Sequence, residues 1–472
     1  MPSVFDVEVL TRGPGHRVAD APFSVAVAQT TRQRLAAERL RHATFVVEQE
    51  LFASSDRDEV DDDDRALTLV ALDAAGDVVG TVRLAPAGRG RDLGWWVGSR
   101  LAVARAARGH APGVGAALVR AACAHAERLG ALRFDARVQT ANVPLFRRLG
   151  WDALADEKAY GHPHVLMSWP VDRIARLAAR TKSPLGHLLA PLATGPAGLG
   201  GAGFVGDDAA PVPGSDLVAA TDAILPSMVE RDPTWAGWCA VLVNLNDVAA
   251  MGAAPVALLD ALGARDASFA SRVVRGISAA ARAWDVPVLG GHTQLGVPAS
   301  LSVTALGRTA APVPAGGGEP GHTVTVTADL GGGWRPGYTG AQWDSTSARS
   351  TAELQTLGSF VARTRPAAAK DVSMAGLVGT LGMLAEASGC GAVLDVADVP
   401  APDLTTSGDW LTCFPGFAMI TTDVPGRTPE PAGTATSRAC GELTHDVGVR
   451  LRWPDGRSTS ALPSHVTGLG PA

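Results

Sequence analysis

The sequence predicts a combination of α/β and α+β folds, with a mixed sheet and crossover helices first and a two-part α/β unit after it. Three observations lead to this prediction. Strand-like and helix-like patterns alternate from about residue 21 to 170, which is the order that builds a sheet with crossover helices. The glycine-rich stretch 195–203 cannot bury a core, and a second break rich in proline and glycine at 310–321 divides the rest of the chain into halves. A chain of 472 residues also exceeds what one core accommodates.

These breaks define four expected segments. They are residues 1–170, a linker with a glycine-rich segment at 171–205, a first half at 206–312 and a second half at 318–472. The glycine-rich segment is either a plain linker or a flap over bound phosphates, because glycine lets backbone N–H groups approach an anion closely.

Each expected element follows from a local pattern. Apolar residues at helical spacing predict helices, and alternating runs bounded by turn residues predict strands. In the first part we expect a helix at 30–52, a hairpin of strands 67–72 and 78–84, a strand at 95–103, a helix at 113–129 and a strand at 133–139. In the second part we expect strand-like runs at 217–220 and 241–243, a helix at 268–284, a strand and turn at 286–293, a strand at 323–328 and a helix that ends at 388–389.

Composition excludes several classes of protein. Hydrophobic residues make up 46% and charged residues 19% of the chain, which is typical of a globular enzyme rather than a disordered or coiled-coil protein. The formal charge of −6 gives no sign of a nucleic-acid binder. Five cysteines without CxxC spacing indicate neither a zinc site nor disulfides. Because the N-terminal residues also lack a signal-peptide pattern and no long apolar run occurs, we expect a cytoplasmic protein without a membrane partner.

Three short acidic signatures occur at residues 206–210, 221–222 and 244–252. Carboxylates beside glycines and small residues suit a magnesium-nucleotide site, because hard cations take oxygen ligands and keep several waters. The alternative interpretation is that these residues only cap turns and helix starts.

A glycine-rich turn precedes the predicted helix 113–129. Unpaired N–H groups and the positive end of the helix dipole at this point can hold a diphosphate. Together with the later segment 142–151, the turn resembles that of the acyl-CoA N-acyltransferase superfamily, the GNAT fold. By this resemblance the residues that bind acetyl-CoA, or another acyl-CoA, are Val103, Arg108, Gly109, Gly113, Val114, Gly115 and Asn142. The alternative is a glycine turn that merely starts a helix.

The resemblance implies transfer of an acyl group to an amine, which must lose a proton. Candidate bases are Glu48, Glu59 and Asp135. Two departures are notable: the turn is longer than usual at 110–112, and Arg147 stands where many relatives place the tyrosine that protonates the leaving thiolate. The acidic run 56–64 is either a solvated loop or, as in the autoinducer-synthase branch that this region resembles, a contact for a cationic acceptor.

In the second part, five motifs occur in order: the three acidic signatures, Gly290 to Thr293, and Lys370-Asp371 with Gly376. This order resembles the AIR-synthase-like superfamily, which includes selenophosphate synthetase and thiamine-monophosphate kinase. The resemblance implies a half that pairs with its twin in a dimer, an α/β second half, and ATP near the dimer interface. Met374-Ala375 and the lack of a cysteine and a lysine at 195–204 depart from particular branches.

The same resemblance assigns roles to individual residues. Magnesium or triphosphate ligands are Asp207, Asp208, Asp222 and Asp247; nucleotide contacts are Thr221, Asn246, Gly290, Gly291 and Thr293; and catalytic candidates are His292 and Lys370. Lys370 either contacts a phosphate or forms a buried ion pair with a neighbouring carboxylate.

The sequence therefore predicts a bifunctional small-molecule enzyme. One part is an N-acyltransferase that uses acyl-CoA, and the other is an ATP- and Mg²⁺-dependent, AIR-synthase-like enzyme that phosphorylates an oxygen-bearing substrate. We expect a homodimer through the second part. Two alternatives stay open: one domain is catalytically silent and senses CoA or nucleotide for the other, or both sites are vestigial and the chain is structural.

Overall fold

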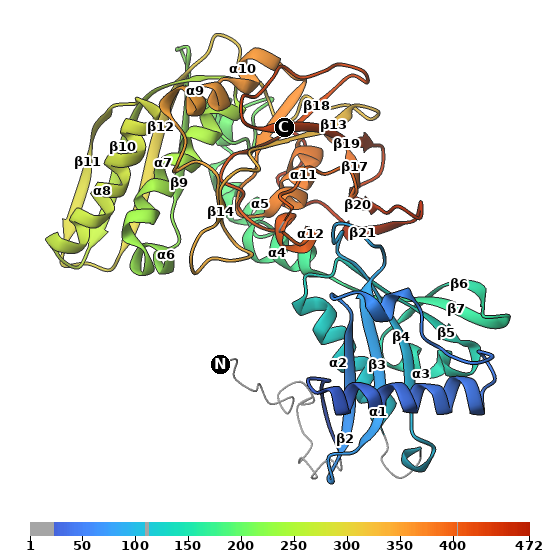
Figure 1. Ribbon diagram of the computed structural model, residues 1–472. Coiled ribbons are helices and arrows are strands. Elements are labelled where there is room, and N and C mark those ends of the chain that lie inside the picture. Colours follow the sequence, from blue (N-terminus) through green and yellow to red (C-terminus); the bar gives the residue numbers. More distant parts are fainter. Residues whose placement is uncertain (1–22, 109–112, 404) are drawn as a thin grey trace. The chain divides into compact units, whose positions relative to one another are not determined.

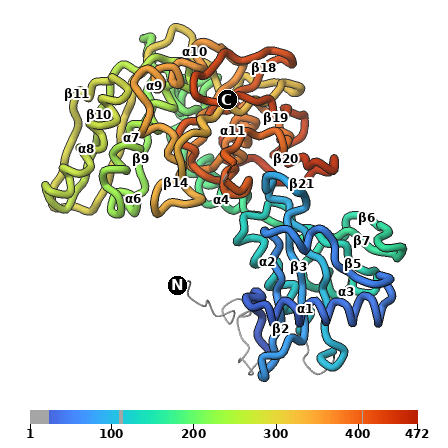
Figure 2. Tube along the Cα trace, viewed as in Figure 1, coloured from blue at the N-terminus to red at the C-terminus, as the bar shows by residue number. Residues whose placement is uncertain are grey.

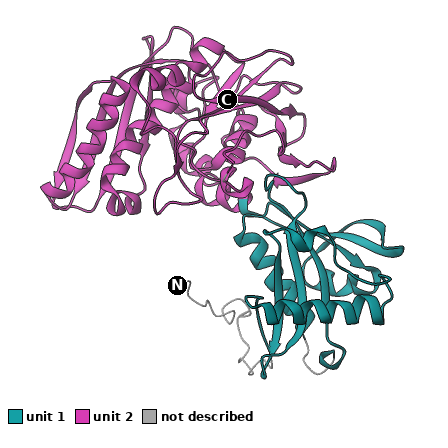
Figure 3. Ribbon diagram, in the orientation of Figure 1, with its two compact units in different colours: residues 1–173 teal, residues 174–472 magenta. Residues whose placement is uncertain are grey.

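The described part of the computed structural model comprises residues 23–108, 113–403 and 405–472. The chain divides into two units, residues 1–173 and 174–472 (Figure 3). Among the helices within the described ranges, none has the length and apolar character needed to cross a membrane.

The first unit is built on a seven-stranded sheet with the order β1-β2-β3-β4-β5-β7-β6 (Figure 1). All neighbouring strands are antiparallel except β4 and β5. The strands are β1 (Phe23–Val27), β2 (Leu67–Asp73), β3 (Val78–Pro86), β4 (Trp95–Val103), β5 (Arg133–Gln139), β6 (Asp152–Ala159) and β7 (His162–Trp169). The helices are α1 (Thr31–His42), a π-helical turn (Ala43–Glu48), α2 (Val114–Arg128), α3 (Val143–Arg148) and 3₁₀ turns at Glu59–Asp62, Arg105–Ala107 and Thr140–Asn142.

Helices α1 and α2 cover opposite faces of this sheet because side chains alternate along a strand. Leu69 and Ala71 of β2 belong to the core that includes Leu118 of α2. Val70, which lies between them, packs with Ala37 of α1 instead. Strand β2 is therefore covered on both faces of the sheet.

Strands β4 and β5 pair only at their amino ends. Trp95–Gly98 pairs with Arg133–Ala136, and no ladder in the described structure joins the later residues of the two strands. Strand β4 also carries a bulge, where the register against β3 shifts and Arg100 adopts a φ of 56°. The carboxyl ends of β4 and β5 are therefore not hydrogen-bonded to each other.

The second unit begins with α4 (Arg173–Thr181), α5 (Leu185–Leu189) and 3₁₀ turns at Ala190–Leu192 and Gly198–Gly200. Its first sheet has the order β11-β10-β12-β9-β8. The elements are β8 (Ala210–Pro211), β9 (Leu217–Ala223), α6 (Pro226–Arg231), α7 (Pro233–Ala250), β10 (Ala254–Ala264), α8 (Ala267–Trp284), β11 (Val288–Leu295) and β12 (Ser300–Arg308). Apolar residues of α7, α8 and the sheet form one core, and the trace in Figure 2 shows α8 running beside β10 and β11.

The second sheet of this unit has seven strands in the order β16-β18-β13-β19-β17-β20-β21. Only β17 and β20 run parallel to each other. The elements are β13 (Thr323–Ala328), the pair β14 (Gly333–Trp334) and β15 (Trp343–Asp344), α9 (Thr351–Gly358), α10 (Phe360–Thr364), β16 (Ala368–Asp371), α11 (Gly376–Ala387), β17 (Gly391–Asp395), α12 (Ser407–Trp410), β18 (Ala418–Asp423), β19 (Thr436–Thr444), β20 (Gly448–Arg452) and β21 (Ser458–Leu462). Helix α7 contacts β16, so the two halves of the unit meet there.

Three predictions about elements are wrong in detail. Residues 241–243 lie inside α7, a helix buried around most of its circumference, so their apolar run is not a strand. The helix predicted at 30–52 is α-helical only to His42 and then widens into a π turn. Gly290 to Thr293 form the middle of β11 rather than a turn, because they pair in parallel register with β10.

Candidate functional site

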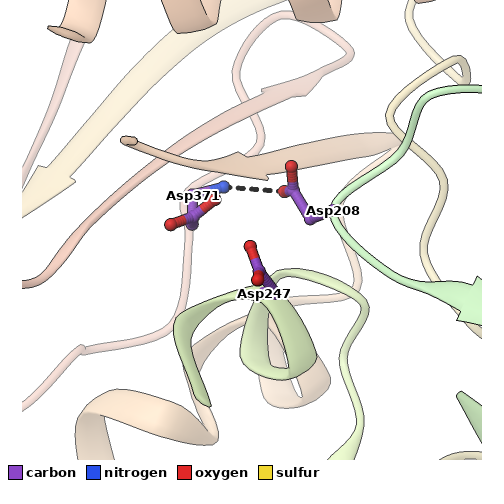
Figure 4. A group of neighbouring side chains, drawn as sticks. All are labelled: Asp208, Asp247 and Asp371. Carbon is purple, nitrogen blue, oxygen red and sulfur yellow. Dashed lines mark hydrogen bonds between the residues drawn. The ribbon is translucent and has the colours of Figure 1, made fainter. Parts of the chain in front are cut away.

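Three aspartates from three separate segments meet in the second unit (Figure 4). Asp208 precedes β8, Asp247 lies near the end of α7, and Asp371 is the last residue of β16. One carboxylate oxygen from each lies within 4.8 Å of the other two. The backbone N–H of Asp371 donates to Asp208 Oδ2 at 2.9 Å, which ties the end of β16 to the loop before β8.

These carboxylates are buried with little positive charge to balance them. Asp247 is 7% exposed and Asp371 2% exposed. Burial, followed by repulsion from Asp371, raises the pKa of Asp247. Burial and repulsion from Asp208 raise the pKa of Asp371 in the same way. Oδ2 of Asp371 has no hydrogen-bond partner among the residues described. A cation with oxygen ligands would relieve the repulsion and engage this oxygen, so the donor set fits Mg²⁺.

Lys370 and Asp207 hold Asp208 in place. The Lys370 ammonium is 2.5 Å from Asp208 Oδ1 and 3.7 Å from Asp207 Oδ1, and its side chain is 3% exposed. Asp207 Oδ2 accepts a hydrogen bond from the backbone N–H of Ala315 at 2.7 Å. Of the two sequence interpretations of Lys370, the structure contains the buried ion pair. Asp207, predicted as a metal ligand, lies outside the group of three that the described residues form.

Of the other predicted ligands of the second unit, Thr221 and Asp222 lie in β9 of the first sheet and Asn246 lies in α7. Asp222 lies near the group of three. Burial raises the pKa of Asp247 and of Asp371, and the charge of Asp222 makes a smaller contribution in the same direction. Thr221 Oγ1 lies 2.8 Å from Thr304 Oγ1 on the uncovered face of the sheet. The Asn246 amide donates to the backbone oxygen of Gly416 at 2.8 Å, so it already joins the two halves of the unit.

The motif Gly290 to Thr293 is not part of the aspartate group. It lies in β11, at the edge of the first sheet, and every residue of β11 is exposed. Gly291 has a local reason to be glycine: a Cβ atom there would lie 2.3 Å from the backbone oxygen of Asp260. His292 pairs in register with Ala261 of β10 and contributes no ligand atom to the group of three.

In the first unit, the predicted CoA turn lies at the start of α2. Gly113 is the N-cap with a φ of 108°, no described side chain caps the helix, and no described atom lies within 4 Å of a Cβ built there. Val103 approaches Gly115, whose built Cβ would be 3.7 Å from Val103 Cγ2, and Val114 is buried beneath the turn. Gly109 lies outside the described residues. These features fit a diphosphate against the N–H groups of α2.

Arg108 and Asn142 border the same region. The Arg108 guanidinium donates to the backbone oxygen of Val103 at 2.8 Å and forms an ion pair with Glu48. Asn142 is exposed at the start of α3 and makes no side-chain capping bond.

Each predicted base is ion-paired. Hydrogen bonding to Arg108 lowers the pKa of Glu48. Glu59 pairs with Arg89 at 2.5 Å and is 69% exposed. Asp135 is 2% exposed and pairs with Arg133 at 2.7 Å, while burial raises its pKa. The structure does not bring these three carboxylates together.

The acidic run is divided: Glu59, Asp62 and Asp64 are exposed, as in a solvated loop, and three of the other aspartates form an internal network. Asp56, Asp58 and Asp61 pair with Arg41, Arg83 and Arg100 at distances of 2.6–3.2 Å. The three arginine side chains are 3–6% exposed. Because three cations balance three anions, these aspartates have no excess charge for a cationic acceptor.

Sequence reasoning missed two groups of residues. Asp371 belongs to the motif Lys370-Asp371 but is not among the predicted ligands, although a carboxylate at the end of a buried strand beside a lysine is a detectable signal. Tyr160 and His164 gave no sequence signal, since no pattern marks side chains that meet across a hairpin. They are placed together by the positive φ of Tyr160, 53°, in the turn between β6 and β7.

Comparison with known families identifies three matched regions. Residues 34–151 match the acetyltransferase (GNAT) family. Residues 206–309 and 347–422 match the N-terminal and C-terminal domains of the AIR synthase related proteins.

Among curated proteins, the chain is 35% identical over 224 residues to an uncharacterized protein of Synechocystis sp., covering 46% of this chain and 69% of that protein. It is 38% identical over 146 residues to a thiamine-monophosphate kinase of Rhodopirellula baltica, covering 27% of this chain and 46% of the kinase. The chain thus spans less than half of the kinase it matches.

Among solved structures, PurL of T. maritima complexed with FGAR aligns with a TM-score of 0.51 at 16% identity. The alignment covers 64% of this chain and 54% of that one. At this identity the similarity concerns the fold alone.

Proposed function

Because the chain belongs to the AIR synthase related family and carries a GNAT acetyltransferase domain ahead of it, we propose that it is a bifunctional enzyme. One unit transfers an acyl group from acyl-CoA, with acetyl-CoA as the proposed donor, to an amine. The other uses ATP and Mg²⁺ to phosphorylate an oxygen-bearing small molecule. The observation that carries the second activity is the buried group Asp208, Asp247 and Asp371 with its unpartnered oxygen.

In the ATP-dependent unit, the proposed Mg²⁺ ligands are Asp208, Asp247 and Asp371. The metal would neutralise charge on the phosphates, while the protein positions them. Lys370 acts by holding Asp208 and Asp207 in place. Similarity to a protein named thiamine-monophosphate kinase supports phosphoryl transfer as the reaction class. The nucleotide contacts of Thr221, Asn246, Gly290, Gly291 and Thr293, and the parts played by Asp222 and His292, remain predictions.

Nucleotide turnover tests this activity. The purified chain should release ADP or AMP from ATP in the presence of Mg²⁺ and candidate substrates, and Asp371→Asn should abolish the release. Asp285→Asn is the matched control, because Asp285 is exposed in a left-handed conformation that asparagine also adopts. Absence of both turnover and Mg-ATP binding in the unmodified chain would refute the proposal.

Two features of the first unit support acyl transfer. The carboxyl ends of β4 and β5 do not pair with each other, and no described side chain caps the start of α2. The unpaired carboxyl ends of β4 and β5 offer backbone groups to an extended thioester arm, and the start of α2 offers N–H groups to the diphosphate. The thioester supplies an activated acyl group when bound. Two measurements test this activity: calorimetry of acetyl-CoA binding, and release of the free CoA thiol in the presence of a panel of amines. If neither binding nor release is observed, the proposed acyl transfer is wrong.

A homodimer through the first sheet of the second unit is part of the proposal. Strand β11 pairs only with β10 in the described structure, and it exposes Val288, Leu289 and Leu295. An edge strand with exposed apolar residues favours pairing with another chain. Sedimentation should give a dimer that Leu289→Lys converts to a monomer. All five cysteines are buried thiols, which supports the proposed cytoplasmic location.

One measurement distinguishes the bifunctional enzyme from the alternative, in which one unit only senses its ligand. A sensor would show a ligand-dependent rise in melting temperature without turnover. The ion-paired state of Glu48, Glu59 and Asp135 is the observation that favours this alternative for the acyltransferase unit.

A further inference from the structure

An acyltransferase needs a group that takes the proton from its amine acceptor, and the carboxylates expected to do so are engaged. Glu48, Glu59 and Asp135 each contact an arginine. The pairing with Arg108 lowers the pKa of Glu48 and so weakens it as a base. The side chain of Asp135 is 2% exposed, so an acceptor does not reach it. Another group of the first unit is therefore a candidate to take the proton.

His164 in β7 has a buried side chain with one ring nitrogen free. It is 5% exposed, and its Nδ1 lies 2.9 Å from the backbone oxygen of His162. A carbonyl oxygen only accepts, so Nδ1 carries a proton, and in the neutral form of such a ring Nε2 keeps its lone pair. No described residue forms a hydrogen bond with Nε2. The imidazole is thus oriented as a proton acceptor.

His164 lies beside the carboxyl ends of β4 and β5, where these two strands do not pair with each other. Its partner in β5 is Gln139, which is beyond the last β5 residue that pairs with β4. Tyr160 connects this position to β4: its ring is 6.4 Å from the His164 ring, and its hydroxyl accepts from the Arg100 guanidinium at 3.1 Å. Phe52 completes the group, with its ring 4.6 Å from that of Tyr160. We call Phe52, Arg100, Tyr160 and His164 the acceptor-side cluster.

The charges around the acceptor-side cluster are already balanced. Arg100 lies over the rings of Phe52 and Tyr160 and pairs with Asp56 and Asp58. Its guanidinium is therefore satisfied by acceptors and does not compete with the amine as a donor to Nε2. The surface next to His164 is aromatic, since Tyr160 is 51% exposed. Such a surface suits an amine attached to an apolar or aromatic group better than a polycation.

We propose that His164 is the general base of the acyltransferase unit and that the acceptor is a primary amine whose apolar part lies against Tyr160. The inference rests on the proposed acyl transfer. The amine nitrogen attacks the carbonyl carbon of the thioester, a C–N bond forms and the C–S bond breaks, and sulfur leaves as the thiolate with the bonding pair. The proton lost from nitrogen goes to Nε2 of His164 and then to the thiolate or to water.

His164→Asn separates this role from a structural one. The asparagine amide can still donate to the His162 oxygen in place of Nδ1, but it has no base in place of Nε2. We expect the rate of CoA release to fall by about 10²-fold or more, the usual contribution of a general base, with acetyl-CoA affinity unchanged. Because a general base acts only in its unprotonated form, the dependence of CoA release on pH should differ between the variant and the unmodified chain. Activity within about threefold of the unmodified chain would overturn the proposal.

His162→Asn is the matched control. His162 is exposed on the same strand and contributes only its backbone oxygen, so this variant should keep full activity and an unchanged melting temperature. If the unmodified chain binds no acyl-CoA, the proposed function itself fails. If it binds and turns over acetyl-CoA while His164→Asn does so equally well, only the inference about His164 fails.

A measurement on the full chain without substrate gives an independent result. Nitrogen-15 spectra of histidine-labelled protein, assigned by comparison with His164→Asn, report which ring nitrogen carries the proton. A neutral ring protonated at Nδ1 supports the proposal. A ring protonated at Nε2 overturns it, because that nitrogen would then have no lone pair to accept a proton.

Discussion

At the scale of single residues, the aspartate group of the second unit concentrates more negative charge than its protein surroundings balance. Four carboxylates are involved. Those of Asp207 and Asp208 lie beside the ammonium of Lys370, and those of Asp208, Asp247 and Asp371 lie close to one another. Buried like charges destabilise a fold unless a cation or protons neutralise them. The described residues alone therefore do not balance this charge, and the proposed Mg²⁺ would.

This imbalance predicts the effect of Asp371→Asn on stability. Without Mg²⁺, the variant should be more stable than the unmodified chain by about 1 kcal/mol, because it removes a buried charge whose Oδ2 is unpartnered. With Mg-ATP, the unmodified chain should gain stability and the variant should not. Urea unfolding with and without Mg-ATP measures both effects. A variant that is less stable without Mg²⁺ would show that Asp371 serves the fold and not a metal.

The arginine–aspartate network of the first unit predicts sensitivity to acid. Despite burial, which opposes it, hydrogen bonds from Arg41 lower the pKa of Asp61, and those from Arg83 lower the pKa of Asp58. A folded-state pKa below the unfolded value gives stability that is present above the ordinary aspartate pKa of about 3.9 and is lost as pH falls below it. The melting temperature of the first unit should therefore fall steeply below about pH 4. Arg41→Gln should make this fall shallower, and an unchanged slope would contradict the assignment.

At the scale of elements, α11 fixes the end of the described chain. Glu386 is 3% exposed and accepts hydrogen bonds from the backbone N–H groups of Val466, Thr467 and Gly470 and from the Thr467 hydroxyl. The backbone oxygen of Thr467 in turn accepts from the N–H of Gly186, so this segment also holds the region before the first sheet. One buried carboxylate thus joins three parts of the second unit.

Glu386→Gln should destabilise the second unit by about 2–3 kcal/mol, since hydrogen bonds to a charged acceptor are lost and an amide group faces several donors. Glu230→Gln is the control, because Glu230 forms an exposed ion pair with Arg265 and should change stability by less than about 1 kcal/mol. Chemical unfolding followed by tryptophan fluorescence compares the two. Equal effects would show that Glu386 contributes nothing beyond a surface ion pair.

Elements also show where prediction from sequence succeeds. Strands β4, β5 and β13 have the predicted bounds, and β2, β3 and α2 agree within two residues, because alternation, helical spacing and Gly130 are local signals. Residues 241–243 were mistaken for a strand because a short apolar run does not distinguish a buried strand from a buried helix. The π turn after α1 has no such signal at all.

At the scale of the whole molecule, each unit has its own core. One core comprises residues of the first sheet with α2, and another comprises the first sheet of the second unit with α7 and α8. The two family matches fall in separate units. The mixed-sheet fold class and both family resemblances drawn from the sequence are confirmed by these matches.

Separate cores predict separate responses to ligands. Calorimetric unfolding should show two transitions, of which acetyl-CoA raises one and Mg-ATP raises the other, because a ligand stabilises only the unit that binds it. Asp371→Asn should remove the shift with Mg-ATP and leave the shift with acetyl-CoA intact. A single transition that both ligands raise equally would show that the units unfold as one.

The sequence by itself determined the two families, the order of most strands and helices, and three acidic segments near a predicted nucleotide site. These are properties of residues that are neighbours in the sequence, so they do not depend on how the elements pack. Only the tertiary structure decided which carboxylates meet. It brought Asp371 to Asp208, 163 residues away in sequence, and left Asp207 and Asp222 outside the group of three. It also paired each predicted base with an arginine. Contacts between distant segments depend on how sheets and helices pack, and the local pattern of residues does not encode that packing.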